Sequence, residues 1–439
     1  MKKRLIAAAA VFIMMAEAVL PVFASATDIE LGVEVTAEAA YIVNDDTGRV
    51  VFQKNADRKM YPASITKIMS AALAMTMCED IENTMVTVPY DVWVEFDGID
   101  ISNAGLYGGE ILSMSDLIHC MLIQSANEAA SSVAAYFGRE SFIEAMNRKA
   151  RELGCSGTHF TNPHGLFDED HYTTAHDLYL ITRWALTVPG FKEITSLSYY
   201  TLSATNIHSE REIYSTIMLQ NSSSGYYTRY IKGIKTGTID ESGRCLVTRA
   251  ESGGMSFTGI FLGCPFEVDT RFWGEGNSVF TNARLSFDWL FDNTEVSEVV
   301  RAGTPVSETS LKYASEKDYL MLYSAFPVST IIETDTSESP VITYETNIPE
   351  EVEAPVTNGQ VIGSARVYSD GIYIGDVDLV AMEDIDKSYF IFIMDRINRL
   401  LTSTPAIICY AVLLVLTALY IYYMLVVVRR ADAARNRRN

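Results

Sequence analysis

The strongest constraint on this chain is an uncharged apolar segment near its C-terminus. Residues 405–428 form a run of 24 residues without a charge. As a helix this run is about 36 Å long, enough to cross a hydrocarbon core of about 30 Å. The 429–439 segment that follows carries five arginines, and such clusters mark the cytoplasmic side of a membrane helix. We therefore predict a transmembrane helix at 405–428 and a cytoplasmic basic tail at 429–439.

The N-terminus has the pattern of an export signal. Three basic residues at 2–4 precede an apolar run at 5–15, and small residues at 24–26 provide a cleavage site. We expect a signal peptide at 1–26; the alternative is a retained N-terminal anchor, for which the run is short. The chain is thus predicted to be a single-pass protein of the cytoplasmic membrane, with its body on the extracytoplasmic face.

The exported body contains the tetrad Ser64-Ile65-Thr66-Lys67. Apolar residues recur at helical spacing from Ile65 to Leu73, so Ser64 is expected in the first turn of a buried helix, with Lys67 on the same face. Burial lowers the pKa of a lysine towards that of a usable base, and a neutral amine beside a hydroxyl can take its proton. Isolated S-x-x-K tetrads are nevertheless common, and most combine a helix cap with a surface lysine.

Two further motifs make the tetrad more specific. Ser125-Ala126-Asn127 opens an apolar helical run, and Lys235-Thr236-Gly237-Thr238 stands before a strand-like segment. Each motif is common alone, but S-x-x-K, S-x-N and K-T-G in this order are typical of penicillin-binding proteins and class A β-lactamases. We therefore predict that the three segments meet in one cleft.

With these motifs the sequence resembles the serine D-alanyl-D-alanine carboxypeptidases, the low-molecular-weight penicillin-binding proteins. The likeness also includes Asp46-Thr47-Gly48 and the segment from Phe160 to Leu166, and it spans residues 35–385. It implies an enzyme without metal or other cofactor. The implied partners are peptidoglycan stem peptides ending in D-Ala-D-Ala and β-lactam antibiotics.

The resemblance also implies the catalytic roles. Ser64 would attack the carbonyl between the two D-alanines, and Lys67 would take its proton. Ser125 would pass that proton to the leaving amine, while Asn127 would orient Lys67 or hold a substrate amide. Ala126 stands where relatives commonly have glycine, which bears on substrate preference and leaves the chemistry unchanged.

The third motif is implied to bind the substrate. Lys235 and Thr236 would hold the terminal carboxylate, a contact that suits an exopeptidase. Gly237 would let the peptide lie along the strand. The backbone N–H groups of Ser64 and Thr238 would form the oxyanion hole.

The order of patterns predicts an α+β fold with an antiparallel sheet, the penicillin-binding/β-lactamase-like domain, at 35–291. A strand pair is expected first, then helices, then strands. The strand pair is 40–44 and 49–52; the helical patterns are 64–77, 114–123, 127–137, 140–153 and 174–187; the later strand patterns are 197–204, 212–218, 244–251 and 255–263. Beyond it we expect a small all-β domain at 294–386, with a hairpin at 360–367 and 372–380, and a juxtamembrane segment at 387–404 near the outward membrane face.

A polar cluster between residues 164 and 177 allows two interpretations. Its histidines and carboxylates are of the types that ligate zinc. The interpretation we favour is a loop beside the active site followed by a helix start, because Thr173 and Thr174 with Asp177 form an N-terminal helix signal. The cluster consists of His164, Asp168, Asp170, His171, His176 and Asp177.

Charge and cysteine content narrow the function further. The net charge of −22 makes nucleic acid an improbable partner. The five cysteines outside the membrane segment are an odd number without metal-ligand spacing, and we interpret them as buried apolar residues rather than a disulfide framework.

Three functional alternatives stay open at this point. A D,D-endopeptidase of peptidoglycan cross-links would use the same motifs. A class A-like β-lactamase would too, but no E-x-x-L-N segment follows Asn127 to supply its deacylating glutamate. A catalytically inactive, membrane-tethered wall-binding protein is disfavoured by the intact motifs.

Overall fold

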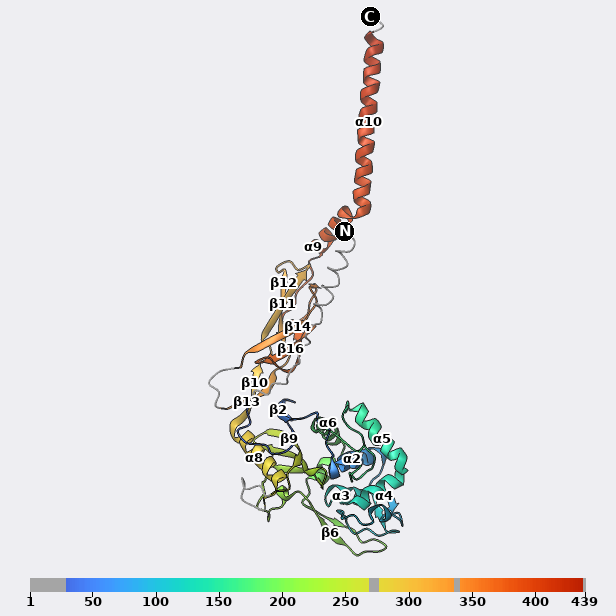
Figure 1. Cartoon of the computed structure of the whole chain (residues 1–439). Helices are drawn as coiled ribbons and strands as arrows, with labels where there is room; N and C mark the ends of the chain where they lie inside the picture. Colours follow the sequence, from blue (N-terminus) through green and yellow to red (C-terminus); the bar gives the residue numbers. More distant parts are fainter. Residues whose placement is uncertain (1–28, 268–275, 335–339, 437–439) are drawn as a thin grey trace, which may run out of the picture. The chain divides into compact units, whose positions relative to one another are not determined.

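The computed structural model describes residues 29–267, 276–334 and 340–436. The predicted signal peptide lies outside these residues. The described chain divides into two compact units. The N-terminal unit comprises the residues up to 297 together with 329–334, and the C-terminal unit comprises 298–328 together with the residues from 340 onwards; the colour bar of Figure 1 locates these ranges.

A five-stranded antiparallel sheet forms the centre of the N-terminal unit, with strand order β2-β1-β9-β8-β7. The first pair is β1 (Ala39–Asn44) and β2 (Val50–Lys54), and the later strands are β7 (Ile231–Ile239), β8 (Gly243–Ser252) and β9 (Met255–Cys264). The K-T-G motif therefore lies within β7 rather than before a strand. Glycines at 233 and 237 hide the alternation that identifies a strand in sequence.

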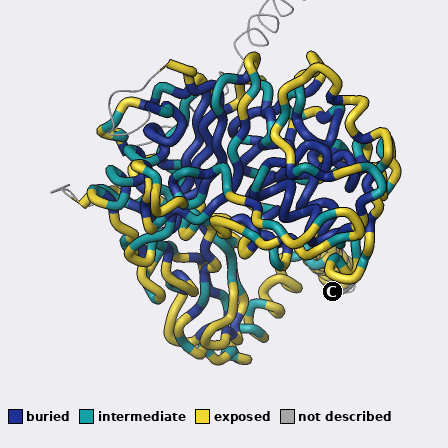
Figure 2. The backbone as a smooth tube through the Cα atoms, turned by 90° about the horizontal axis from the view of Figure 1, so that it is seen from below, coloured by how far each residue is buried: buried dark blue, intermediate teal, exposed yellow. Residues whose placement is uncertain are grey.

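Helices cover both faces of this sheet. Alternate residues of β1 face different cores: Ala39, Tyr41 and Val43 pack with the helices between 67 and 185, whereas Ala40 and Ile42 pack with α8. Buried segments, dark blue in Figure 2, accordingly fill the inside of the unit. The helices are α2 (Lys67–Met77), α3 (Met114–Leu122), α4 (Asn127–Phe137), α5 (Arg139–Glu152), α6 (Ala175–Ala185), α7 (Phe191–Thr195) and α8 (Ser278–Asn293), with 3-10 turns η1 (Ala63–Thr66), η2 (Val94–Phe96) and η3 (Met218–Gln220).

Two short two-stranded antiparallel sheets complete the unit, β3 (Met85–Thr87) with β4 (Ile111–Ser113) and β5 (Tyr199–Leu202) with β6 (Arg211–Tyr214). The strand predicted at 212–218 ends early. Thr216 leaves the ladder, and its backbone N–H donates to the carbonyl of Ile123. No two of the six cysteines are joined by a disulfide in the described part of the chain, and four of the six are buried.

The C-terminal unit is built around a six-stranded sheet of order β14-β16-β17-β12-β11-β15. The predicted hairpin is present as β16 and β17, and the predicted combination of an α+β domain with an all-β domain is confirmed. The strands are β11 (Pro305–Lys312), β12 (Tyr319–Ser324), β14 (Ile342–Asn347), β15 (Glu351–Glu353), β16 (Val361–Ser369) and β17 (Ile372–Val380). A separate pair, β10 (Thr294–Val300) and β13 (Val328–Glu333), belongs mostly to the N-terminal unit.

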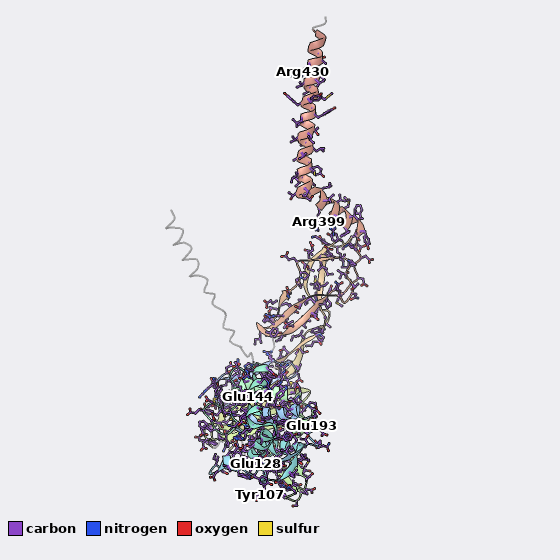
Figure 3. All side chains as sticks on the ribbon, turned by 90° about the vertical axis from the view of Figure 1, so that its right-hand side faces the viewer. Tyr107, Glu128, Glu144, Glu193, Arg399 and Arg430 are labelled. Carbon is purple, nitrogen blue, oxygen red and sulfur yellow. The ribbon has the colours of Figure 1, made fainter. Side chains whose placement is uncertain are left out.

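Two helices end the chain, α9 (Tyr389–Thr402) and α10 (Thr404–Asn436). The Tyr313 hydroxyl donates to Asp395 on α9 at 2.8 Å, so this hydrogen bond holds α9 against the all-β part of the C-terminal unit. The stretch Thr404–Asp432 is long and apolar enough to cross a membrane, and Figure 3 labels Arg430 near its end.

Candidate active site

Ser64 and Lys67 lie at the start of the first central helix. Ser64 is in the 3-10 turn η1, and Lys67 is the first residue of α2. The Lys67 Nζ lies 2.9 Å from the Ser64 Oγ. Lys67 is fully buried, whereas Ser64 is half-buried. The serine is thus accessible and the lysine is not, which suits a nucleophile and its base.

The Lys67 amine has two further partners, the Asn127 Oδ1 at 2.8 Å and the His164 carbonyl oxygen at 2.8 Å. Both are acceptors that cannot donate. Burial holds the pKa of Lys67 well below its usual range, and the nearby charge of Lys235 lowers this pKa further. A neutral amine has two N–H groups and one lone pair. The two acceptors use both N–H groups, so the lone pair faces the Ser64 hydroxyl.

The S-x-N motif lies in the turn between α3 and α4, with both residues buried. Asn127 begins α4, and its backbone N–H and its side-chain amide both donate to the carbonyl of Ser102 at 3.0 Å. Ser125 adopts a left-handed backbone conformation, with φ of 65°. Its hydroxyl makes no hydrogen bond within the described part of the chain.

Strand β7 carries the third motif past the nucleophile. A Cβ on Gly237 would lie 3.0 Å from the Pro62 carbonyl oxygen and 3.1 Å from the Ser64 nitrogen, so a side chain here would push the strand away. Thr238, the next residue, is exposed. The close approach at Gly237 therefore brings the open strand edge to the Ser64 backbone.

Lys235 and Thr236 precede Gly237 on the same strand. Lys235 is fully buried, and burial lowers its pKa to about 7. Its Nζ donates to the Thr236 carbonyl at 2.9 Å. The Thr236 and Thr216 hydroxyls share a hydrogen bond of 2.5 Å. Thr216 was not expected in the site, and no motif in the sequence indicates it.

Glu128 is a second residue that the sequence analysis missed, although it directly follows Asn127. It is fully buried, and its Oε1 accepts from the backbone N–H groups of Ala104 and Leu106 at 2.6 and 3.4 Å. Its Oε2 is buried without a hydrogen-bond partner among the described residues. Burial raises the pKa of Glu128, while its charge acts to raise that of Lys67.

The polar segment from 159 to 174 folds as a loop under the nucleophile, and α6 follows it. Gly165, with φ of 91°, packs so closely that a Cβ would overlap the Ala63 carbonyl oxygen. Thr174 caps α6 by accepting from the Asp177 N–H at 3.0 Å, as predicted. In the described ranges, no group of three or more His, Cys, Asp or Glu side chains is arranged to hold a metal ion.

His171 stabilises this loop from inside. The Thr161 N–H donates to its Nδ1 at 3.1 Å, so the ring proton lies on Nε2, which donates to the Thr66 Oγ1 at 2.8 Å. Burial lowers the pKa of His171 to about 3 and that of His164 to about 4. Both rings are thus neutral parts of the structure.

The fold and the three convergent motifs define a serine hydrolase of the penicillin-binding class. Residues 24–265 match the D-alanyl-D-alanine carboxypeptidase family, and residues 295–387 match the C-terminal domain of penicillin-binding protein 5. The first match covers more than half of the chain. This chain therefore belongs to the D-alanyl-D-alanine carboxypeptidase family, and the predicted activity class is confirmed.

Individual relatives agree along most of the chain. The D-alanyl-D-alanine carboxypeptidase DacF of Bacillus subtilis is 25% identical over 364 residues, covering 82% of this chain and 88% of the relative. DacA of Haemophilus influenzae is 27% identical, covering 83% and 90%. The solved structure of penicillin-binding protein 5 from Haemophilus influenzae superposes with a TM-score of 0.62 at 24% identity, covering 81% of this chain and 99% of that one.

Proposed function

We propose that this protein removes the terminal D-alanine from peptidoglycan stem pentapeptides through an acyl-enzyme on Ser64. The observation that carries this proposal is the set of three partners around the Lys67 amine. Two are obligate acceptors, and the third is the Ser64 hydroxyl. A neutral Lys67 can hydrogen-bond to all three partners only if its lone pair accepts the hydrogen bond of the Ser64 hydroxyl. This lone pair is then placed to take the Ser64 proton.

The first chemical step is acylation. Ser64 Oγ attacks the carbonyl carbon between the two D-alanines as its proton passes to Lys67, and the backbone N–H groups of Ser64 and Thr238 stabilise the oxyanion. The C–N bond then breaks, and the amine of the leaving D-alanine takes a proton. Ser125, two residues before Asn127 in the S-x-N motif, is proposed to relay that proton.

The substrate carboxylate is proposed to bind beside Lys235 and Thr236. A charged lysine and a hydroxyl suit a carboxylate, and Thr216 holds the Thr236 hydroxyl in place. A peptide lacking a free carboxyl end would leave this lysine unpaired, which favours trimming of termini over cleavage of cross-links. Water then attacks the ester, Lys67 takes its proton, and the shortened peptide leaves with Ser64 restored.

We further propose that β-lactam antibiotics acylate Ser64 and leave slowly. The catalytic unit is proposed to lie on the extracytoplasmic face of the membrane, with α10 spanning it and the arginine-rich tail in the cytoplasm.

The test is D-alanine release from a purified stem pentapeptide by the full chain in detergent. We expect release by the natural protein and none by Ser64→Ala, with labelled penicillin forming a lasting adduct that the variant lacks. Rapid turnover of penicillin without an adduct would make the protein a β-lactamase. Cleavage of cross-linked muropeptides without D-alanine release, followed by mass spectrometry, would make it an endopeptidase.

A further inference from the structure

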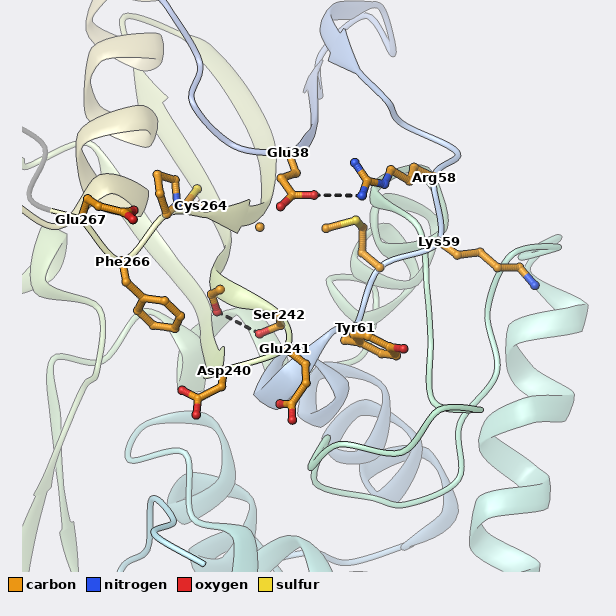
Figure 4. Close-up of a pocket in the computed structure, with 14 residues that line it drawn as sticks. Glu38, Arg58, Lys59, Tyr61, Asp240, Glu241, Ser242, Cys264, Phe266 and Glu267 are labelled. Carbon is orange, nitrogen blue, oxygen red and sulfur yellow. Dashed lines mark hydrogen bonds and ion pairs between the residues drawn. The ribbon is translucent and has the colours of Figure 1, made fainter.

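The cavity of about 410 Å³ shown in Figure 4 adjoins the proposed active site, because Tyr61 in its wall lies three residues before Ser64. A different group of side chains is connected to Lys67 through a buried histidine. It centres on Glu95 in the 3-10 turn η2, a residue that belongs to none of the three motifs. The contacts of this group link Glu95 to the orientation of the catalytic base.

His164 contacts the catalytic base through its backbone. Its carbonyl oxygen accepts from the Lys67 amine at 2.8 Å, and its side chain is only 5% exposed. The Leu166 N–H donates to the His164 Nδ1 at 3.2 Å, so the ring proton lies on Nε2. Because the ring and the carbonyl belong to one residue, a shift of the ring would displace the carbonyl that holds Lys67.

Glu95 stabilises the other side of this ring. The Nε2 atom of His164 is buried and makes no hydrogen bond with a residue that the structure describes. The Glu95 Oε2 lies 3.5 Å away, close enough for a carboxylate charge to stabilise the N–H dipole. Phe96, the next residue of η2, packs edge-on against the same ring, with the centroids 5.4 Å apart. The turn η2 therefore contacts the His164 ring through two side chains.

Two helices hold Glu95 in turn. Its Oε1 accepts from the Ser131 hydroxyl on α4, and Arg139 at the start of α5 donates to both carboxylate oxygens, at 3.3 and 2.6 Å. Ser131 lies one helical turn after Asn127, so Glu95 is bonded to the helix that begins with Asn127. Burial acts to raise the pKa of Glu95, but its polar contacts outweigh this and lower the pKa to about 2. The carboxylate is therefore charged at neutral pH.

The backbone on either side of His164 has contacts of its own. The Pro163 carbonyl accepts from the Ser70 hydroxyl at 2.7 Å, and the Gly165 N–H donates to the Asn162 Oδ1 at 2.7 Å. We therefore expect the loop to stay folded without the carboxylate contact. Only the His164 ring and its carbonyl would move.

We propose that Glu95 is a positioning residue that, through the His164 ring, holds the His164 carbonyl on the Lys67 amine. The inference rests on the proposed function, in which Lys67 takes the Ser64 proton. Without Glu95 the buried Nε2–H of His164 has no electrostatic partner, which is costly, and the ring moves to relieve that cost. The Lys67 lone pair then no longer faces the Ser64 hydroxyl.

Stopped-flow acylation of the full chain by labelled penicillin tests this role. We expect Glu95→Ala to lower the rate constant of acylation about tenfold, with less than about a twofold change in the dissociation constant of the noncovalent complex that precedes it. Glu95→Gln keeps an oxygen acceptor for the His164 Nε2–H and should restore the rate constant to within about threefold of the natural value. An unchanged rate constant in Glu95→Ala would overturn the inference and leave the proposed function intact. No acylation of the natural protein would instead contradict the proposed function.

Arg139→Ala separates positioning from a structural ion pair. It removes the other charged partner of Glu95 but leaves the carboxylate beside His164, so we expect acylation within about twofold of the natural rate. A loss as large as that in Glu95→Ala would show that the ion pair, and not the histidine contact, is what matters, and would overturn the inference. The matched control is Glu152→Ala, which removes an exposed carboxylate paired with Lys149 and should acylate normally.

A double substitution tests whether Glu95 acts through the ring of His164. His164→Phe keeps a ring at this position but lacks the N–H group, so adding Glu95→Ala to it should change the acylation rate constant by less than about twofold. Tenfold losses from Glu95→Ala in both backgrounds, with thermal unfolding midpoints that show every variant to be folded, would mean that Glu95 acts by another route and would exclude the inference.

Discussion

The side-chain amide of Asn127 donates to the Ser102 carbonyl at 3.0 Å, and this bond sets the direction of the catalytic hydrogen bonds. With its nitrogen used in this way, Asn127 presents its oxygen to Lys67 at 2.8 Å. The backbone N–H of Asn127 donates to the same carbonyl. The Ser102 carbonyl thus fixes the Asn127 side chain, and Asn127 in turn positions the Lys67 amine. That amine orients the Ser64 hydroxyl.

This chain of contacts predicts that Lys67 cannot be replaced by another cation. Lys67→Ala should lower the rate of Ser64 acylation by penicillin on the order of 10³-fold, because the base is lost. Lys67→Arg should be equally poor, since a guanidinium stays protonated. Stopped-flow acylation measures both, with the exposed Lys192→Ala as a control that should acylate normally. Substantial acylation by the arginine variant would show that charge, and not proton transfer, is what Lys67 contributes.

The buried state of Lys235 predicts an alkaline limit to activity. Its pKa is lowered to about 7 by burial, and only the charged form pairs with a carboxylate. We expect kcat/KM to fall about tenfold per pH unit above that pKa in the free enzyme. In Lys235→Arg this alkaline fall of kcat/KM should move to a pH above the range that can be measured, because arginine stays charged. If kcat/KM fell at the same alkaline pH in the natural protein and in Lys235→Arg, the titrating group would be one other than Lys235.

Glu128 is predicted to tune Lys67 through its charge. Its Oε1 accepts two backbone N–H groups from the 104–106 segment, and glutamine can preserve both bonds. Because the Glu128 charge raises the pKa of Lys67, Glu128→Gln should move the acidic limb of kcat/KM to lower pH. Glu128→Ala should also loosen the segment. If Glu128 had a purely structural role, Glu128→Gln would lose activity at every pH and the acidic fall of kcat/KM would stay at the same pH. The pH profile of kcat/KM therefore distinguishes a charge effect from a structural one.

The sequence predicted those parts of the molecule that have a periodic or motif signature. The helix predicted at 127–137 coincides with α4, and the three motifs do meet at Ser64 and Lys67. The acceptors at Ser102 and His164 were not foreseen, because they are backbone carbonyls and any residue type supplies one. Thr216 was missed for a different reason, since its contact with Thr236 depends on where β6 ends. Helix α8, which covers the second sheet face, was also not predicted.

Membrane attachment is predicted to depend on α10. The full chain should stay in the membrane pellet after alkaline carbonate extraction, because Thr404–Asp432 can span the bilayer. A chain ending at Ser403 retains α9, whose exposed Phe390 and Leu400 allow only surface binding. Carbonate should therefore release it. Extraction of the full chain would contradict a transmembrane α10.

Buried neutral His171 predicts acid lability of the loop under the nucleophile. In the folded state its pKa is about 3, because burial disfavours the charged ring, whereas in the unfolded chain it is about 6.5. Between these values the unfolded state binds the proton and the folded state does not. Stability is therefore retained above pH 6.5 and lost as the pH falls, by about 3 kcal/mol between pH 6.5 and 4.

Urea unfolding of the full chain in detergent, followed by tryptophan fluorescence, measures this loss. His171→Asn should be less stable at pH 7, because it gives up the bonds to Thr66 and Thr161, but its stability should depend less on pH. The control is His176→Asn, whose ring is 42% exposed and pairs with Asp57; it should keep the pH dependence of the natural protein. A His171→Asn protein that loses as much stability on acidification as the natural chain would place the acid-sensitive group elsewhere.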